Sequence, residues 1–297
     1  LYNYLYVTDP AKFGDQQAVA VDLTTVIPLP SPRYVSPNGS DTGNNCNSKD
    51  SPCATVQKAV DEAAMGDEIH VAAGVYTDLH QRSGLTQTVY INKNVALLGG
   101  HSTSDWVTRN PVQRPTILDA QGLGRVVVIT GSVTVTVDGF RVVHGTAVDG
   151  DGGGIYVGAS EPVTLSANMI YSNTATHEGG GVYAPSADLR LYNNVLYTNT
   201  AELGGGVYVS GTAALVNDTL VGNTAVISGG ALYLAGGWLA VTNTIFVSNT
   251  AVMSGGVAYA EPGAASVFAY NDLWGNDKSE NVTSANSFSV DPLFQSV

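Results

Sequence analysis

Apolar, polar and glycine positions repeat along the second half of this chain at a nearly constant interval. From about residue 150 onward, two or three small residues, mostly glycine, are followed by an aliphatic residue and a tyrosine. These blocks end at Tyr156, Tyr183, Tyr208, Tyr233 and Tyr259, which are 27, 25, 25 and 26 residues apart. Self-similarity at a period of this length is typical of solenoids, propellers and repeat arrays.

A second block recurs at the same period and consists of an apolar residue three positions before an asparagine. Its members are Ile170 and Asn173, Leu196 and Asn199, Leu220 and Asn223, Phe246 and Asn249, and Leu273 and Asn276. Short alternating stretches bounded by Gly and Asn are typical of β-strands, and no helical periodicity lies between them. Propeller blades are longer and leucine-rich repeats have a regular Leu pattern. The sequence therefore predicts an all-β fold, a parallel β-helix whose coils pair with the coils above and below.

Equivalent residues of successive coils should then stack in rows along the axis. We expect one internal row at Ile155, Val182, Val207 and Leu232 and another at Ile170, Leu196, Leu220, Phe246 and Leu273. Sharp turns between the sheets require positive φ angles, which Gly and Asn tolerate best. Stacked asparagine side chains can also form a hydrogen-bonded ladder.

Strand alternation places the residue after each internal position on the outside. We therefore predict an exposed aromatic ladder at Tyr156, Tyr183, Tyr208, Tyr233 and Tyr259, and a shorter exterior stripe at Tyr171, Tyr197 and Trp274. Two interpretations stay open for this candidate binding site. The rings shield their own sheet, or they form a platform for sugar rings or for another protein surface.

The residues before the regular repeat divide into three parts. Residues 1–33 form an N-terminal extension with a Pro-rich linker at 28–32, and its strand-like stretches favour a strand packing on the following helix over a remnant of another domain. Residues 54–65 carry an apolar stripe and predict a helix that caps the open end of the stack. Residues 66–145 supply irregular early coils, with long excursions at 78–87 and 100–115.

The regular coils occupy residues 146–276 and a C-terminal segment occupies 277–297, which gives one β-helix over 34–297 and roughly nine coils. The chain has 12 basic and 25 acidic residues, a formal charge of −13, and no basic cluster. These features exclude nucleic acid and anionic membranes as partners. No stretch is apolar over the length that a membrane span requires.

Cys46 and Cys53, the two cysteines of the chain, lie in a short polar segment without nearby histidines. This arrangement predicts a local disulfide in preference to a zinc site or two free thiols. A disulfide implies an oxidising compartment outside the cytoplasm. We therefore expect an extracellular or cell-surface protein whose leader has been removed.

At its repeat blocks the chain resembles the right-handed parallel β-helix repeat proteins, and in particular the polymorphic outer membrane protein repeats with their Gly-Gly and Phe-x-x-Asn blocks. The literal Phe occurs at Phe246, and Leu or Ile replaces it elsewhere. Residues 34–41, 54–61 and 66–76 resemble the entry into secreted bacterial β-helices, and 271–294 resembles the end of repeat regions that precede a cell-surface anchor. The resemblance implies a pectate-lyase-like, single-stranded solenoid with an N-terminal capping helix. It leaves activity open, because such proteins include lyases, epimerases and adhesins.

Candidate catalytic groups are sparse in the regular coils. Arg190 and Lys278 are the basic residues of 146–297, against twelve acids, which disfavours a lyase acting on uronate polymers. Asp149 and Asp151 could hold Ca²⁺, but Asp-Gly sequences are more often turns. The densest group of charged residues combines Arg109, Arg114, Arg125 and Arg141 with Asp105, Asp119 and Asp138. Ion pairs that brace the excursion at 100–115 against the helix are favoured over an active site.

These observations favour a non-catalytic, extracellular structural or adhesion module that binds glycan or a cell-surface protein, or copies of itself. No catalytic residue and no cofactor is assigned. The alternative is a polysaccharide-active enzyme, a lyase, epimerase or hydrolase, on the same fold.

Overall fold

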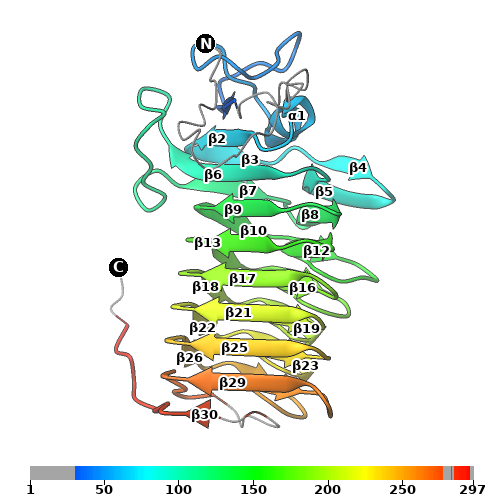
Figure 1. The fold of residues 1–297 in the computed structure, drawn as a ribbon, viewed down its shortest axis with the longest axis vertical. Coiled ribbons are helices and arrows are strands. Elements are labelled where there is room, and N and C mark those ends of the chain that lie inside the picture. Colours follow the sequence, from blue (N-terminus) through cyan, green and yellow to red (C-terminus); the bar gives the residue numbers. More distant parts are fainter. Residues whose placement is uncertain (1–30, 277–281, 283, 295–297) are drawn as a thin grey trace, which may run out of the picture.

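The computed structural model describes residues 31–276, 282 and 284–294, which form a solenoid of stacked coils (Figure 1). Along the stack, strands of successive coils pair in parallel, so Tyr183 neighbours Tyr208 as predicted. From β2 to β30 the chain makes eight turns, one fewer than the predicted nine. The N-terminal coils lie at the top of Figure 1 and the C-terminal coils at the bottom.

Two large sheets run along the solenoid. The ten-stranded sheet contains β1 (Arg33–Val35), β2 (Glu68–Ala72), β6 (Val95–His101), β9 (Val135–Asp138), β13 (Val163–Ser166), β17 (Asp188–Tyr192), β21 (Thr212–Val216), β25 (Trp238–Thr242), β29 (Ala265–Ala269) and β30 (Ser284–Ala285). The seven-stranded sheet contains β3 (Gly74–Tyr76), β7 (Thr116–Asp119), β10 (Phe140–Val143), β14 (Met169–Tyr171), β18 (Val195–Tyr197), β22 (Thr219–Val221) and β26 (Ile245–Val247).

Two further sheets complete the walls. The eight-stranded sheet contains β4 (His80–Arg82), β5 (Leu85–Ile91), β8 (Arg125–Gly131), β12 (Ile155–Ala159), β16 (Val182–Ala184), β20 (Val207–Val209), β24 (Leu232–Leu234) and β28 (Ala258–Ala260). The five-stranded sheet contains β11 (Thr146–Ala147), β15 (Thr174–Ala175), β19 (Thr200–Leu203), β23 (Thr224–Ser228) and β27 (Thr250–Ala251). The predicted excursion at 78–87 is partly regular, because β4 forms an antiparallel hairpin with β5.

The core contains both predicted internal rows, together with the inward side chains of the ten-stranded sheet. The side chains of Ile155, Val182, Val207 and Leu232 are at most 2% exposed, and those of Ile170, Leu196, Leu220 and Phe246 are fully buried. Leu273 packs against this core but is only partly buried. The alternation of apolar and polar residues therefore identified the inner face of each strand correctly.

Asparagine ladders hold the turns of successive coils together, as predicted. Asn199 shows the pattern: its Nδ2 donates to the Ile170 carbonyl at 2.8 Å and to Asn223 Oδ1 at 3.0 Å, and its Oδ1 accepts from Asn173 Nδ2 at 3.0 Å. The ladder asparagines satisfy buried backbone groups that no strand pairing reaches. The positive φ angle belongs to the residue before each one, such as Thr198 with φ of 51°.

The glycine blocks are required because neighbouring coils approach closely. A Cβ on Gly180 would lie 2.4 Å from the Thr200 carbonyl oxygen and 2.6 Å from that of Gly205. This close approach lets the backbone of each glycine block form hydrogen bonds to the next coil, such as the one from Gly180 N to Gly204 O at 3.2 Å. Only glycine gives the backbone this freedom and proximity.

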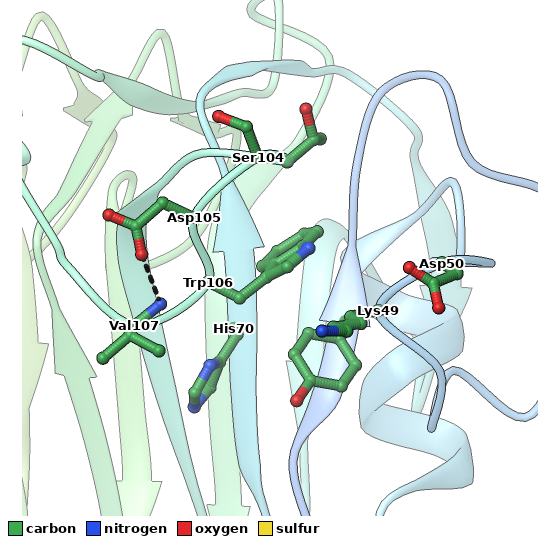
Figure 2. Close-up of a pocket in the computed structure, with 9 residues that line it drawn as sticks. Lys49, Asp50, His70, Ser104, Asp105, Trp106 and Val107 are labelled. Atoms are coloured by element: carbon green, nitrogen blue, oxygen red, sulfur yellow. Dashed lines mark hydrogen bonds between the residues drawn. The ribbon is translucent and has the colours of Figure 1, made fainter.

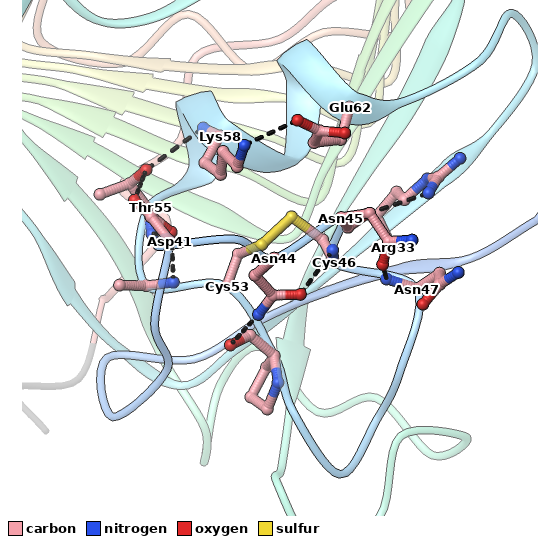
Figure 3. The surroundings of a disulfide bond; sticks show 12 residues. Arg33, Asp41, Asn44, Asn45, Cys46, Asn47, Cys53, Thr55, Lys58 and Glu62 are labelled. Carbon is pink, nitrogen blue, oxygen red and sulfur yellow. Dashed lines mark hydrogen bonds and ion pairs between the residues drawn. A yellow bond between two sulfur atoms is a disulfide. The ribbon is translucent and has the colours of Figure 1, made fainter.

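The N-terminal end is closed by the predicted helix and disulfide (Figure 3). Helix α1 (Val56–Glu62) begins at Thr55, whose side chain accepts a hydrogen bond from Lys58 N, and it buries Val56, Gln57, Ala59 and Val60. Cys46 and Cys53 form the disulfide and are fully buried. In the part of the chain that the structure describes, no helix is long and apolar enough to cross a membrane. The predicted strand within residues 1–30 lies outside the described residues.

Candidate functional site

The five predicted tyrosines form one column on the outside of the eight-stranded sheet. Strand pairing places Tyr156, Tyr183, Tyr208, Tyr233 and Tyr259 side by side in that order. Consecutive ring centroids are 5.3 or 5.4 Å apart, with interplanar angles from 4° to 38°. We call this set the tyrosine column.

The outward direction of these side chains is confirmed, but the prediction that they form an exposed ladder is wrong for its central members. Tyr208 and Tyr233 are only 8% and 6% exposed, and the other three are half-buried. The rings stack on one another, so their faces cover each other. The turn glycines pack against their inner ends: a Cβ on Gly204 would lie 3.0 Å from Tyr208 Cα. The column therefore offers ring edges and hydroxyls rather than a flat aromatic surface.

Acidic and basic side chains border the tyrosine column. Burial raises the pKa of the Tyr208 hydroxyl to about 12, and the Tyr233 hydroxyl donates a short hydrogen bond to Glu261. Burial, followed by the nearby charge of Asp151, raises the pKa of Glu178. The Arg125 guanidinium lies over the Tyr156 ring, 5.6 Å from its centroid. The tyrosine column is thus bordered by both positively and negatively charged side chains.

Asp149 and Asp151, the candidate Ca²⁺ ligands, lie in a turn at the edge of the tyrosine column. Asp149 has a φ angle of 51°, and Asp151 Oδ1 accepts a hydrogen bond from Glu178 N at 3.2 Å. The Asp151 carbonyl accepts a further bond from Arg125 Nε at 2.8 Å. Over residues 31–276, 282 and 284–294, no group of three His, Cys, Asp or Glu side chains is arranged to hold a metal ion.

The charged residues that the sequence analysis singled out in the early coils do not gather into one cluster. The Arg109 guanidinium forms a short ion pair with Asp138, and Arg109 Nε donates to the Gly99 carbonyl at 2.8 Å. Arg114 lies 3.9 Å from Asp105. The Arg109 contacts fasten the excursion that follows β6 to the ten-stranded sheet. The excursion is therefore braced against this sheet and not, as predicted, against the helix.

Tyr171 and Tyr197 lie on the outside of the seven-stranded sheet and stack in parallel, with centroids 4.5 Å apart and an interplanar angle of 10°. Trp274 does not extend this pair directly, because Val221 and Val247 occupy the same row in the next two coils. The predicted aromatic stripe is therefore an aromatic pair at one end of a largely aliphatic row.

A cavity of about 590 Å³ near the N-terminal end was not expected from the sequence (Figure 2). Tyr34 on β1, His70 on β2 and Trp106 in the excursion between β6 and β7 line it, together with the polar side chains of Lys49, Asp50 and Asp105. These residues are non-repetitive and far apart in the sequence. Of them, the sequence analysis had identified Asp105 alone, because of its charge.

No protein of curated function matches the chain. A solved structure described as a rhamnogalacturonan lyase is similar to it, with 14% identity, a TM-score of 0.34, and coverage of 88% of this chain and 85% of that one. Residues 124–251 match the family model described as "Right handed beta helix region". The parallel coils of this chain are accordingly those of a right-handed β-helix.

Proposed function

We propose that the protein is an exported structural module that associates with copies of itself and so serves adhesion. The observation that carries this proposal is the outer surface of β14, β18, β22 and β26. Their eight outward positions hold no charged residue: Met169, Tyr171, Val195, Tyr197, Thr219, Val221, Ile245 and Val247. We call these positions the charge-free face.

The overall charge of the chain supports a second copy as the occupant of this face. A formal charge of −13 makes most surfaces of two copies repel each other. The charge-free face lacks this repulsion over four consecutive coils and presents mostly apolar side chains. Two such faces can pack as two sheets of one protein do, about 10 Å apart. A two-fold axis makes the contact self-complementary.

Export is supported by the disulfide between Cys46 and Cys53. Such bonds persist in oxidising surroundings outside the cytoplasm. The resemblance to cell-surface repeat proteins and the absence of a convergent catalytic constellation in the described part of the chain agree with a module that binds rather than transforms. Localisation at a bacterial cell surface is part of this proposal.

The test is the mass of the protein in solution, measured by light scattering over a wide concentration range. We expect the wild type to form dimers and Val195→Lys to remain monomeric, because the variant places an ammonium group in the middle of the charge-free face. Thr164→Lys is the matched control, since residue 164 faces outward on the ten-stranded sheet. A wild type that stays monomeric at high concentration refutes the proposal.

The alternative function, a polysaccharide-active enzyme, is favoured by Glu178. This carboxyl is half-buried beside Asp151, and its pKa is raised, as expected of a general acid. Release of reducing ends from neutral or acidic polysaccharides, lost in Glu178→Gln but retained in Glu202→Gln, would replace the first proposal. The wild type's failure to release them would remove this alternative.

A further inference from the structure

We propose that the cavity near the N-terminal end binds a neutral sugar residue of a glycan. This site is separate from the charge-free face, and the inference does not depend on self-association. It rests on three features of the cavity: its aromatic wall, a buried donor without a partner, and the charges at its rim (Figure 2).

The aromatic wall is made by rings held at steep angles to one another. The ring centroids of Trp106 and Tyr34 are 5.0 Å apart, with an interplanar angle of 69°. Those of His70 and Tyr34 are 5.6 Å apart, with an angle of 77°. The His70 ring also stacks on the His101 ring, with centroids 4.4 Å apart and an angle of 8°. Packing on both sides fixes these rings in place before any ligand arrives. Preformed aromatic walls bind the C–H faces of sugars at little entropic cost.

The unpartnered donor belongs to Trp106. Its side chain is only 7% exposed, and among the described residues its Nε1 has no hydrogen-bond partner. Figure 2 shows the indole nitrogen on the side of the ring that faces Lys49 and Asp50. Buried N–H groups in folded proteins nearly always have an acceptor, and the indole N–H can only donate. A ligand hydroxyl in the cavity would supply that acceptor.

The rim presents charged groups to a ligand. Within the described ranges, Lys49 and Asp50 form no ion pair. Asp105 is the second carboxylate of the rim; hydrogen bonds from Thr108 N and Val107 N lower its pKa, and it lies 3.9 Å from the Arg114 guanidinium. The Lys49 ammonium and the Asp50 carboxylate offer a donor and an acceptor to hydroxyl groups. Because Arg114 pairs with Asp105, the rim charges balance and provide no net positive charge to attract uronates or other anionic sugars.

The size of the cavity agrees with this class of ligand. About 590 Å³ lies within the range of small-molecule sites, which combine an apolar lining with a few polar groups. The cavity is open to solvent beside the exposed loop that carries Lys49 and Asp50. A sugar at the end of a longer glycan could therefore enter while the remainder of the chain stays in solvent.

The test is calorimetric titration of the full chain with cellotetraose, xylotetraose, mannotetraose and galactotetraose, and with tetragalacturonate as the anionic probe. We expect at least one neutral probe to bind. Trp106→Phe should weaken that binding about tenfold or more, the loss typical of truncating a buried aromatic anchor. Trp238→Phe is the matched control, because Trp238 is 44% exposed on β25, outside the cavity.

Two exposed rim variants keep the test decisive if Trp106→Phe fails to fold. Lys49→Ala and Asp50→Ala alter side chains that the core does not need, and each should weaken the same probe while the unfolding temperature stays unchanged. The inference is overturned if no neutral probe binds, if tetragalacturonate binds more tightly than all of them, or if binding survives unchanged in the folded cavity variants.

Discussion

Asp218 offers the sharpest test of how the stacked coils control chemistry. It occupies a ladder position that asparagine holds in the two preceding coils, at Asn168 and Asn194. Its side chain is 1% exposed, and its Oδ1 accepts bonds from Asn194 N at 2.7 Å and from Asn194 Nδ2 at 2.9 Å. Burial nevertheless raises its pKa from 3.8 to about 7. The fold therefore contains a carboxyl group that is stabilised in its neutral form.

Replacing Asp218 by Asn should stabilise the protein at neutral and alkaline pH. A carboxyl whose pKa is raised on folding contributes its full stability below about pH 4 and loses it as the pH rises to about 7. The difference between the two pKa values corresponds to about 4 kcal/mol in the free energy of unfolding, at about 1.4 kcal/mol for each pKa unit. Asparagine is never ionised, and its amide can donate to the Leu191 carbonyl as Asn194 donates to Leu165. The bond from Val216 N to Oδ2 is lost, which reduces the gain by about 1 kcal/mol.

The assay is urea unfolding at several pH values between 4 and 8, the range set by the two pKa values. Near pH 8, the free energy of unfolding of Asp218→Asn should exceed that of the wild type by about 3 kcal/mol. The difference should shrink as the pH falls towards 4. Asp188→Asn is the control, because that carboxylate pairs with Arg190 at the surface. A difference that does not change with pH, or a variant that is less stable at pH 8, would refute the reasoning.

Three further predictions follow from the same structure. Asn223→Ala should cost about 3 kcal/mol in urea unfolding, because it removes the bond to the Leu196 carbonyl and leaves the buried backbone N–H of Asn199 without its acceptor. Gly205→Ala should prevent folding as judged by circular dichroism, since its Cβ would lie 2.3 Å from the Thr224 carbonyl oxygen, whereas Gly236→Ala, with 3.6 Å to its nearest neighbour, should fold. Burial lowers the pKa of His101 to about 4, so the wild type should lose stability as the pH falls from 6.5 towards 4, and His101→Phe should show a smaller loss in the same unfolding series.

The repeat made much of the fold predictable. Strand alternation has a period of two, so a tyrosine that follows a buried aliphatic residue must point outward, and Tyr183 does so in the expected register with Tyr208. The same in-register stacking brings Asn199 next to Asn223, and the polar segment around Cys46 made a local disulfide foreseeable. These features depend on local chain geometry repeated from coil to coil.

Exposure on the outside did not follow from that geometry. Whether Tyr208 is open or covered depends on rings and turns contributed by other coils, and the strand pattern carries no information about them. The aromatic cavity was also beyond prediction. Tyr34, His70 and Trp106 belong to no repeat, and an irregular excursion brings the last of them back onto the first two.

The sequence by itself thus determined the period, the inner face of each strand, the ladders and the disulfide, because each arises from residues close in the chain or one period apart. Only the tertiary structure decided which outward side chains are covered, where a cavity forms and which carboxyl group has a strongly raised pKa. Those properties depend on burial and on electrostatic surroundings. Both are set by all the neighbours of a group in space, wherever they lie in the chain.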